Sequence, residues 1–179
     1  MADLPLREDR IRVPLPGGKG KWSEWKKAMV PNETVDERTG AELTEERGPN
    51  QDGYMWSNID DKLCKVGRLC GIYEFQAKGN PEEGQLESAV VYVGSTCPRE
   101  EDNRLVCHRL KSRIIRYCRY GNHKDVLIND ALSRGYELWV RYKEAGSAVE
   151  AQEWENDLLN RYDYAWNVRN NGTIRVILT

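Results

Sequence analysis

The chain has 179 residues, of which 39% are hydrophobic and 31% are charged, and its formal net charge at pH 7 is −2. This length suits one globular domain with an attached arm. No apolar run approaches the roughly 20 residues that a membrane-spanning helix needs, and the N-terminus shows no apolar signal segment. We therefore expect no membrane partner and an intracellular location, either nuclear or cytoplasmic.

The near-neutral average conceals two segments of opposite charge. Between residues 104 and 124 there are seven Lys or Arg and no Asp or Glu, whereas residues 32–61 carry nine acidic residues against two arginines. A net acidic chain argues against nucleic-acid binding, but a cationic segment of this kind favours it. The alternative is a solvated helix face beside an acidic loop, and charge alone does not separate these two interpretations.

Five cysteines, at positions 64, 70, 97, 107 and 118, form no CxxC pair and are odd in number. A disulfide framework is unexpected in a reducing compartment. Cys97, Cys107 and Cys118, taken with His108 and His123, do not match the ligand spacings of familiar zinc sites. We therefore expect small, partly buried thiols rather than a metal centre.

Residues 1–60 are predicted to form an N-terminal arm. Trp22, Trp25 and Met29 lie at positions i, i+3 and i+7, which predicts a short amphipathic helix that ends before Pro31. Residues 32–53 are acidic, rich in turn formers and poor in apolar residues, as is typical of a mobile segment. The chain has six Trp and nine Tyr against one Phe, and such amphipathic rings suit a binding surface as well as a core.

Residues 61–179 have the pattern of a compact α+β domain. Strands are predicted over residues 71–75 and 89–94, and the Gly/Pro/Glu-rich loop between them indicates an antiparallel hairpin. The other predicted elements are helices over residues 105–120, 125–134 and 147–162, and strands over residues 136–143 and 173–178. Together they predict an α/β/α sandwich, in which helices flank a small, mostly antiparallel central sheet.

Two of these helices carry residues suited to phosphodiester chemistry. Glu155 lies on the apolar stripe of its helix, where an ionised carboxylate is costly unless it is paired or binds a metal. Arg113 and Tyr117 are four residues apart and so are neighbours on one face of the basic helix. Arginine can bind a phosphate through two hydrogen bonds, and a carboxylate can hold a hard divalent ion. The alternatives are a glutamate that pairs with an arginine and a helix face of solvated arginines.

The two strands of the hairpin carry the tripeptides Gly71-Ile72-Tyr73 and Tyr92-Val93-Gly94. These resemble the paired signature of the GIY-YIG nuclease superfamily. Further features follow in the order typical of that family, namely Arg113 with Tyr117, His123, Glu155, and Asn167 twelve positions after Glu155. The strings at residues 163–167 and 170–172 look most like the plant effector-of-transcription branch of the superfamily.

This resemblance implies a divalent-metal-dependent endonuclease or nickase that hydrolyses DNA by a one-metal mechanism. Tyr73 would be the general base, and its pKa near 10 would have to be lowered for that role. Tyr92 would position the attacking water or share the role of base. Arg113 would stabilise charge on the phosphate, and Glu155 would hold a single Mg²⁺ or Mn²⁺. Tyr117 and His123 would orient the phosphate or the base.

The same resemblance assigns structural roles near the site, and the charge of the basic segment assigns binding roles. Gly71, Gly94 and Asn167 are expected to secure the fold near the site. The residues expected to attract the DNA backbone, independently of its sequence, are Arg109, Lys111, Arg116, Arg119 and Lys124.

Two departures from the family pattern bear on the path of the nucleic acid. The loop between the tripeptides and the stretch from Tyr92 to Arg113 are both longer than in compact members. The longer stretch contains an acidic cluster at residues 98–102.

Two other functions compete with the nuclease. One is a DNA-binding module that does not cut and acts as a transcriptional regulator, and the other is a protein-interaction domain that uses the acidic segment with Trp22 and Trp25. The joint presence of Tyr73, Tyr92, Arg113 and Glu155, rather than any single residue, favours catalysis.

Overall fold

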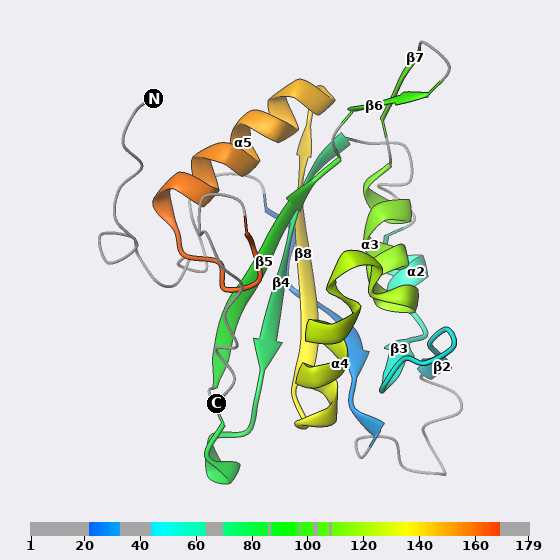
Figure 1. Ribbon diagram of the computed structural model, residues 1–179, viewed down its shortest axis with the longest axis vertical. Helices are drawn as coiled ribbons and strands as arrows, with labels where there is room; N and C mark the ends of the chain where they lie inside the picture. The colour runs from blue at the N-terminus through cyan, green and yellow to red at the C-terminus, as the bar shows by residue number, and fades with distance from the viewer. Residues whose placement is uncertain are drawn as a thin grey trace.

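The computed structural model describes residues 22–32, 44–63, 70–85, 87–96, 98–101, 104–107 and 109–168. Its centre is a six-stranded antiparallel sheet with the strand order β2-β3-β1-β8-β4-β5. Helices α3 and α4 cover one face of this sheet and α5 covers the other (Figure 1). The predicted α/β/α arrangement around an antiparallel sheet is therefore confirmed.

The strands of the sheet are β1 (Lys26–Val30), β2 (Thr44–Glu46), β3 (Tyr54–Trp56), β4 (Cys70–Lys78), β5 (Ser88–Ser95) and β8 (Glu137–Ala145). The helices are α2 (Ile59–Lys62), α3 (Leu110–Tyr120), α4 (Asp125–Ser133) and α5 (Ala148–Arg161), with short 3₁₀ turns η4 (Pro81–Glu83) and η5 (Asn122–Lys124). A separate hairpin, β6 (Pro98–Glu101) with β7 (Arg104–Cys107), projects beyond the sheet near the start of α3 (Figure 1).

Strand β4 lies between β5 and β8, and its side chains alternate between the two faces of the sheet. Tyr73 and Phe75 point to the α3 side, where they pack in the main core with Leu110 and Ile114. On the α5 side a smaller apolar cluster forms around Val93 and other residues of β5, α5 and the segment after it. The predicted hairpin of residues 71–75 and 89–94 is therefore confirmed, with longer strands than expected.

The helix ends follow local sequence signals. The hydroxyl of Ser147 accepts a hydrogen bond from the backbone N–H of Glu150 at 3.1 Å, so it caps the start of α5 as predicted. Gly121 ends α3 with φ of +67°, and a Cβ there would lie 2.4 Å from Cα of Asp125. Only glycine fits this tight passage into η5.

The helix predicted around Trp22, Trp25 and Met29 is wrong, because Trp22 forms an isolated bridge with Lys143 and Lys26–Val30 form strand β1. Its register shifts between Lys27 and Met29 where it pairs with β8, and this bulge breaks the alternation that would have indicated a strand. The rings of Trp22 and Trp25 lie 4.5 and 4.6 Å from the guanidinium of Arg141. The i, i+3 spacing of the tryptophans therefore comes from two rings that flank one cation and not from a helical stripe.

The described part of the expected arm is built into the sheet. Strands β1, β2 and β3 lie in residues 22–60 and form half of the six strands, so the sheet continues across the boundary expected near residue 60. Arg47, in the acidic segment, is buried and donates hydrogen bonds to the backbone oxygens of Cys118 and Asp52 and to Oδ1 of Asn129. These hydrogen bonds hold residues 44–53 against α3 and α4, so these residues do not form the mobile segment that the sequence predicts.

The basic helix is shorter than predicted, because residues 104–107 form strand β7 and α3 begins at Leu110. The longer stretch between the second tripeptide and Arg113 thus contains a β-hairpin, and the acidic cluster lies in its first strand, β6. The predicted strand over residues 173–178 lies outside the described residues, as do positions 170–172 and residues 33–43 of the acidic segment.

The cysteines agree in part with the expectation of thiols. Cys118 is a buried free thiol, and burial raises its pKa to about 12. Cys70 is disulfide-bonded, which no spacing pattern in the sequence indicated. No helix in the described ranges is long and apolar enough to span a bilayer.

Candidate active site

Three tyrosines and a histidine converge on the α3 face of the sheet. Tyr92 on β5 and Tyr117 on α3 place their hydroxyl oxygens 3.0 Å apart. Nε2 of His123 in η5 lies 3.4 Å from both hydroxyls. The ring of Tyr73 on β4 packs against Tyr92 and Tyr117, with centroids 6.3 and 5.8 Å away. Four of the predicted site residues, from three separate elements and one turn, thus form one cluster.

Arg113 joins this cluster from α3. It is one turn before Tyr117, and its Nε lies 3.4 Å from the hydroxyl oxygen of Tyr73. The arginine is half-buried, and its guanidinium meets the phenol through Nε. This placement suits a cation that meets an anion at the rim of the cluster.

The glycines of both tripeptides are needed for close packing. A Cβ on Gly94 would lie 2.6 Å from the hydroxyl oxygen of Tyr73, whose ring lies over the glycine on the neighbouring strand. A Cβ on Gly71 would lie 2.2 Å from the carbonyl oxygen of Lys143. Gly94 therefore sets the position of the Tyr73 hydroxyl, whereas Gly71 lets β4 and β8 approach.

Glu155 reaches the site from the opposite side of the sheet. It lies on α5 with 9% of its surface exposed, and it accepts a hydrogen bond from the hydroxyl of Ser95 at the end of β5. Because β5 alternates, Tyr92 points to the α3 face and Ser95 to the α5 face. Strand β5 thus joins the carboxylate to the tyrosine cluster, and none of the described contacts links Glu155 directly to Arg113 or His123.

Asn167 holds strand β5 by its backbone. Its Oδ1 accepts from the N–H of Val93 at 3.0 Å, and its Nδ2 donates to the carbonyl of the same residue at 2.9 Å. The N–H of Trp166 donates to the carbonyl of Val91 at 2.8 Å. The segment after α5 therefore runs along β5 and pairs with backbone groups that an edge strand would otherwise leave open.

Burial controls the ionisation of the phenols. Burial raises the pKa of Tyr73 well above 10, although the nearby Arg113 acts in the opposite direction. Burial also raises the pKa of Tyr92, and the charges of the neighbouring tyrosines and of Glu155 add to this. The lowered phenol pKa that a general base requires is therefore not found in the free protein.

His123 behaves differently because it reaches solvent. Partial burial, together with the positive charges of Lys124 and Arg113, lowers the pKa of the His123 imidazole below its ordinary value of 6.5. The ring is therefore neutral at pH 7, with one nitrogen able to accept a proton or a hydrogen bond from the two hydroxyls that it contacts.

The basic residues of this region differ in how far their side chains are exposed to solvent. Arg109 and Arg116 are exposed on α3, whereas Arg119 lies 3.4 Å from the carboxylate of Glu45. Lys124, expected to contact DNA, is 5% exposed and donates to the carbonyl oxygen of Trp166 at 2.5 Å. Lys124 is thus turned inward and supports the segment that holds β5.

The donor set fits a hydrated divalent ion. In the described part of the chain, no three His, Cys, Asp or Glu side chains gather to form a protein-only metal cage. Mg²⁺ commonly keeps several waters and takes one or two carboxylates together with substrate phosphate oxygens. A single buried carboxylate beside the Ser95 hydroxyl, at Glu155, is compatible with such binding.

Sequence reasoning did not identify two partners near the site. Ser95 directly follows the second tripeptide, and its place at the end of a strand was the signal that could have found it. Glu74 is fully buried on the α5 face, where it pairs with Arg141 at 2.6 Å and accepts from the hydroxyl of Tyr164 at 2.5 Å. A charged residue inside a predicted strand marked Glu74, but its partners are distant in sequence.

A family model described as GIY-YIG domain-containing protein matches residues 22–177. The chain is 33% identical to Protein EFFECTOR OF TRANSCRIPTION 3 of Arabidopsis thaliana over 115 aligned positions, covering 60% of this chain and 39% of that protein. It is 27% identical to Protein EFFECTOR OF TRANSCRIPTION 2 of the same plant over 179 aligned residues, covering 86% of this chain and 32% of that protein. The chain thus spans about a third of the length of these curated relatives. No solved structure matches it significantly.

Proposed function

The chain belongs to the GIY-YIG domain family, and from this premise we propose that it hydrolyses DNA phosphodiester bonds as a divalent-metal-dependent endonuclease or nickase. The observation that carries the proposal is the convergence of Tyr73, Tyr92 and Arg113 at β5, with Glu155 at the end of the same strand. The family is associated with nuclease-type and DNA-binding functions. The cleavage chemistry is our assignment.

In the proposed reaction Arg113 binds the scissile phosphate and stabilises the charge that develops on it. Its Nε meets the hydroxyl of Tyr73 at 3.4 Å, so a phosphate bound by this guanidinium would lie beside the phenol. Glu155 would hold Mg²⁺ or Mn²⁺, whose chemistry there is to offset negative charge on the phosphate oxygens and to lower the pKa of bound water.

The proton of the attacking water passes to the tyrosine cluster. Tyr73 acts as the base in its tyrosinate form: its phenol proton first passes to solvent, an ionisation that burial opposes and the charge of Arg113 favours, and the tyrosinate then takes one proton from the attacking water. Tyr92 and Tyr117 are joined by a hydrogen bond, and the neutral His123 contacts both hydroxyls, which orients them toward the reacting water.

The proposal is tested by nicking of supercoiled plasmid with Mg²⁺, with EDTA, and with the variant Glu155→Ala. We expect cutting that requires the metal and that falls at least about 100-fold without the carboxylate. Glu153→Ala is the matched control, because Glu153 is exposed on the same helix. Cutting that survives Glu155→Ala would contradict the proposed metal site.

A DNA-binding module that does not cut is the second candidate, because both relatives are named effectors of transcription. Such a module would act in the nucleus and would use the exposed Arg109 and Arg116 for backbone contacts. Its signature is DNA binding whose affinity falls steeply as the salt concentration rises, with no DNA cleavage when a divalent metal ion is added. That result would replace the nuclease with the regulator.

A further inference from the structure

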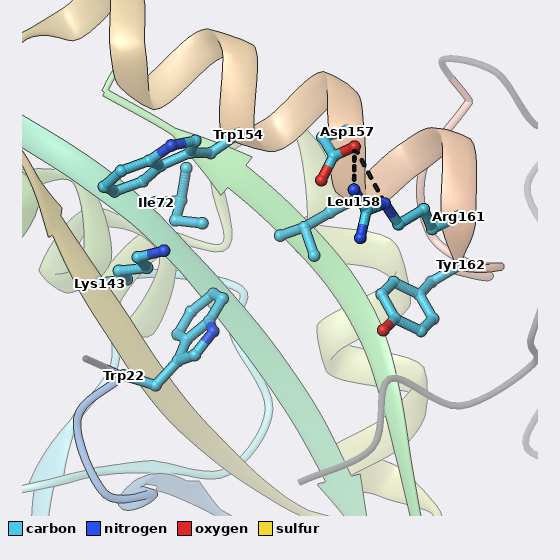
Figure 2. A pocket seen from close by; sticks show the side chains of 8 residues that line it. All are labelled: Trp22, Ile72, Lys143, Trp154, Asp157, Leu158, Arg161 and Tyr162. Carbon is cyan, nitrogen blue, oxygen red and sulfur yellow. Dashed lines mark hydrogen bonds and ion pairs between the residues drawn. The ribbon is translucent and has the colours of Figure 1, made fainter. Parts of the chain in front are cut away.

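A pocket of about 310 Å³ opens on the α5 side of the sheet, away from the tyrosine cluster. Figure 2 shows how its side chains lie. Trp22 and Trp154 stand at one end with Lys143 between them, and Tyr162 lies at the opposite end. Trp22 lies before β1, at an isolated β-bridge with Lys143, whereas Trp154 lies on α5 and Tyr162 is the residue that ends α5.

The floor of the pocket is apolar and its rim is cationic. Ile72 of β4 and Leu158 of α5 line the pocket together with the three aromatic rings. Lys143 and Arg161 bring positive charge, and the one carboxylate, that of Asp157, is paired with Arg161 at 3.0 Å. A flat, apolar group attached to an anion matches this combination.

The ammonium of Lys143 lies 3.9 Å from the centroid of the Trp154 ring. An ammonium on a flexible four-carbon stem can leave such a ring and bind a phosphate, because both positions satisfy its charge. The ring face would then be available for stacking. A cationic ligand is disfavoured here, because it would meet the charges of both Lys143 and Arg161.

Two elements carry residues of both the pocket and the proposed cleavage site. Trp154 directly precedes Glu155 on α5, and Ile72 directly precedes Tyr73 on β4. Neighbouring residues on these elements therefore face either the pocket or the site. A strand that passes Glu155 would reach the pocket within a short distance along α5.

We propose that this pocket binds an unpaired nucleobase of the DNA substrate, stacked on Trp154 and Trp22, with its phosphate on Lys143. The inference rests on the proposed function and specifies its substrate class, which is DNA with a single-stranded segment next to the cleaved bond. Bases in an intact duplex are stacked on one another and cannot enter, whereas aromatic rings beside cations bind single strands without sequence preference.

The test compares two labelled probes by fluorescence anisotropy with the full chain, a 15-nucleotide oligothymidylate and a 15-base-pair duplex. Stacking of one base is worth about a tenfold change in affinity. We expect Trp154→Ala to weaken single-strand binding by about tenfold and duplex binding by less than about twofold, and Trp154→Phe to restore the difference. Trp56→Ala, which removes a ring from β3 outside the pocket, should change neither affinity.

The outcomes separate this inference from the proposed function. If wild-type chain binds the duplex and nicks plasmid, but Trp154→Ala affects both probes equally or neither, the pocket assignment is overturned and the nuclease remains. If the chain binds neither probe, both are overturned. If circular dichroism shows that Trp154→Ala is unfolded, the variant Lys143→Gln tests the inference instead. It should lower the salt dependence of single-strand binding by about one counterion. An unchanged salt dependence overturns the inference.

Discussion

At the scale of single residues, the ionisation of the buried Tyr73 hydroxyl depends on one neighbouring cation, Arg113. Tyr73 is fully buried, and Arg113 is the charged group whose nitrogen reaches its oxygen. Burial makes the tyrosinate costly, while the guanidinium reduces this cost. In the proposed reaction Arg113 would therefore have two tasks, to bind the phosphate and to make the phenol of Tyr73 easier to ionise.

We predict that Arg113→Ala lowers the rate of DNA cleavage by about 10²- to 10³-fold, as the loss of one preorganised donor typically does. Arg113→Lys keeps the charge but loses the planar donor pair, so it should recover only part of the rate. Single-turnover cleavage measures both. Arg134→Ala, at an exposed arginine of α4 paired with Asp130, is the control and should cleave normally.

We predict a pH dependence of stability from His123. In the unfolded chain its imidazole takes up a proton near pH 6.5, whereas in the folded chain the lowered pKa delays uptake to a lower pH. Below about pH 6.5 the unfolded state therefore binds more protons than the folded state, so the free energy of unfolding decreases as the pH falls. Thermal unfolding from pH 8 to pH 5 should show a smaller decline of Tm in His123→Gln than in wild type. An identical decline in both proteins would argue against the lowered pKa.

At the scale of elements, β5 organises the site, because its alternation directs Tyr92 to one face and Ser95, with Glu155, to the other. Its outer side is held by the segment after α5, through the Asn167 amide and the N–H of Trp166. Two elements that are about 70 residues apart in the sequence thus fix one set of side chains. The backbone hydrogen bonds that hold β5 in place therefore also hold the side chains of the candidate site.

We predict that Asn167→Ala lowers the free energy of unfolding by about 3 kcal/mol, because the buried N–H and carbonyl of Val93 lose their partners. For a chain of this size the loss corresponds to a Tm lower by about 10 °C. Urea denaturation measures the change. Val168→Ala, at the next residue and 50% exposed, should stay within about 0.5 kcal/mol of wild type.

The elements that the sequence predicted correctly are those whose pattern is local. The hairpin of β4 and β5, the helix α4 and the capped helix α5 all followed from alternation, turn residues or the Ser147 cap. Strand β1 was missed because a bulge and two rings around Arg141 imitate a helical spacing. The partnerships of Ser95 with Glu155 and of Glu74 with Tyr164 cross 60 and 90 positions, so no local pattern reveals them.

The site was predicted in the same uneven way. The two tripeptides and the spacing of Arg113 and Tyr117 drew attention to residues that the fold brings together. The inward position of Lys124 was not visible, because a basic residue after a basic helix is expected to be solvated. Its cation instead lies 5.4 Å from the Tyr92 ring and holds a backbone carbonyl.

At the scale of the whole molecule, residues 22–63 complete the sheet. Strand β1 lies between β3 and β8, and the segment buries Met29, Val30, Met55 and Ile59 completely. Without it, β8 would become an edge strand with open backbone groups, and the α2 side of the main core would lose its cover. The half of the sheet that carries the candidate site therefore depends on a segment that contributes no residue to the proposed site.

We predict that a chain of residues 61–179 does not fold as a stable unit, although it keeps both tripeptides and Glu155. Removal of β1, β2 and β3 exposes apolar core and leaves the pairing positions of Leu138, Trp139 and Val140 open. Size-exclusion chromatography should show aggregation, and urea titration should show no cooperative transition. A chain that begins at Trp22 retains all six strands and serves as the control. A soluble 61–179 fragment that unfolds cooperatively and cleaves DNA would contradict this dependence and restore a separate arm.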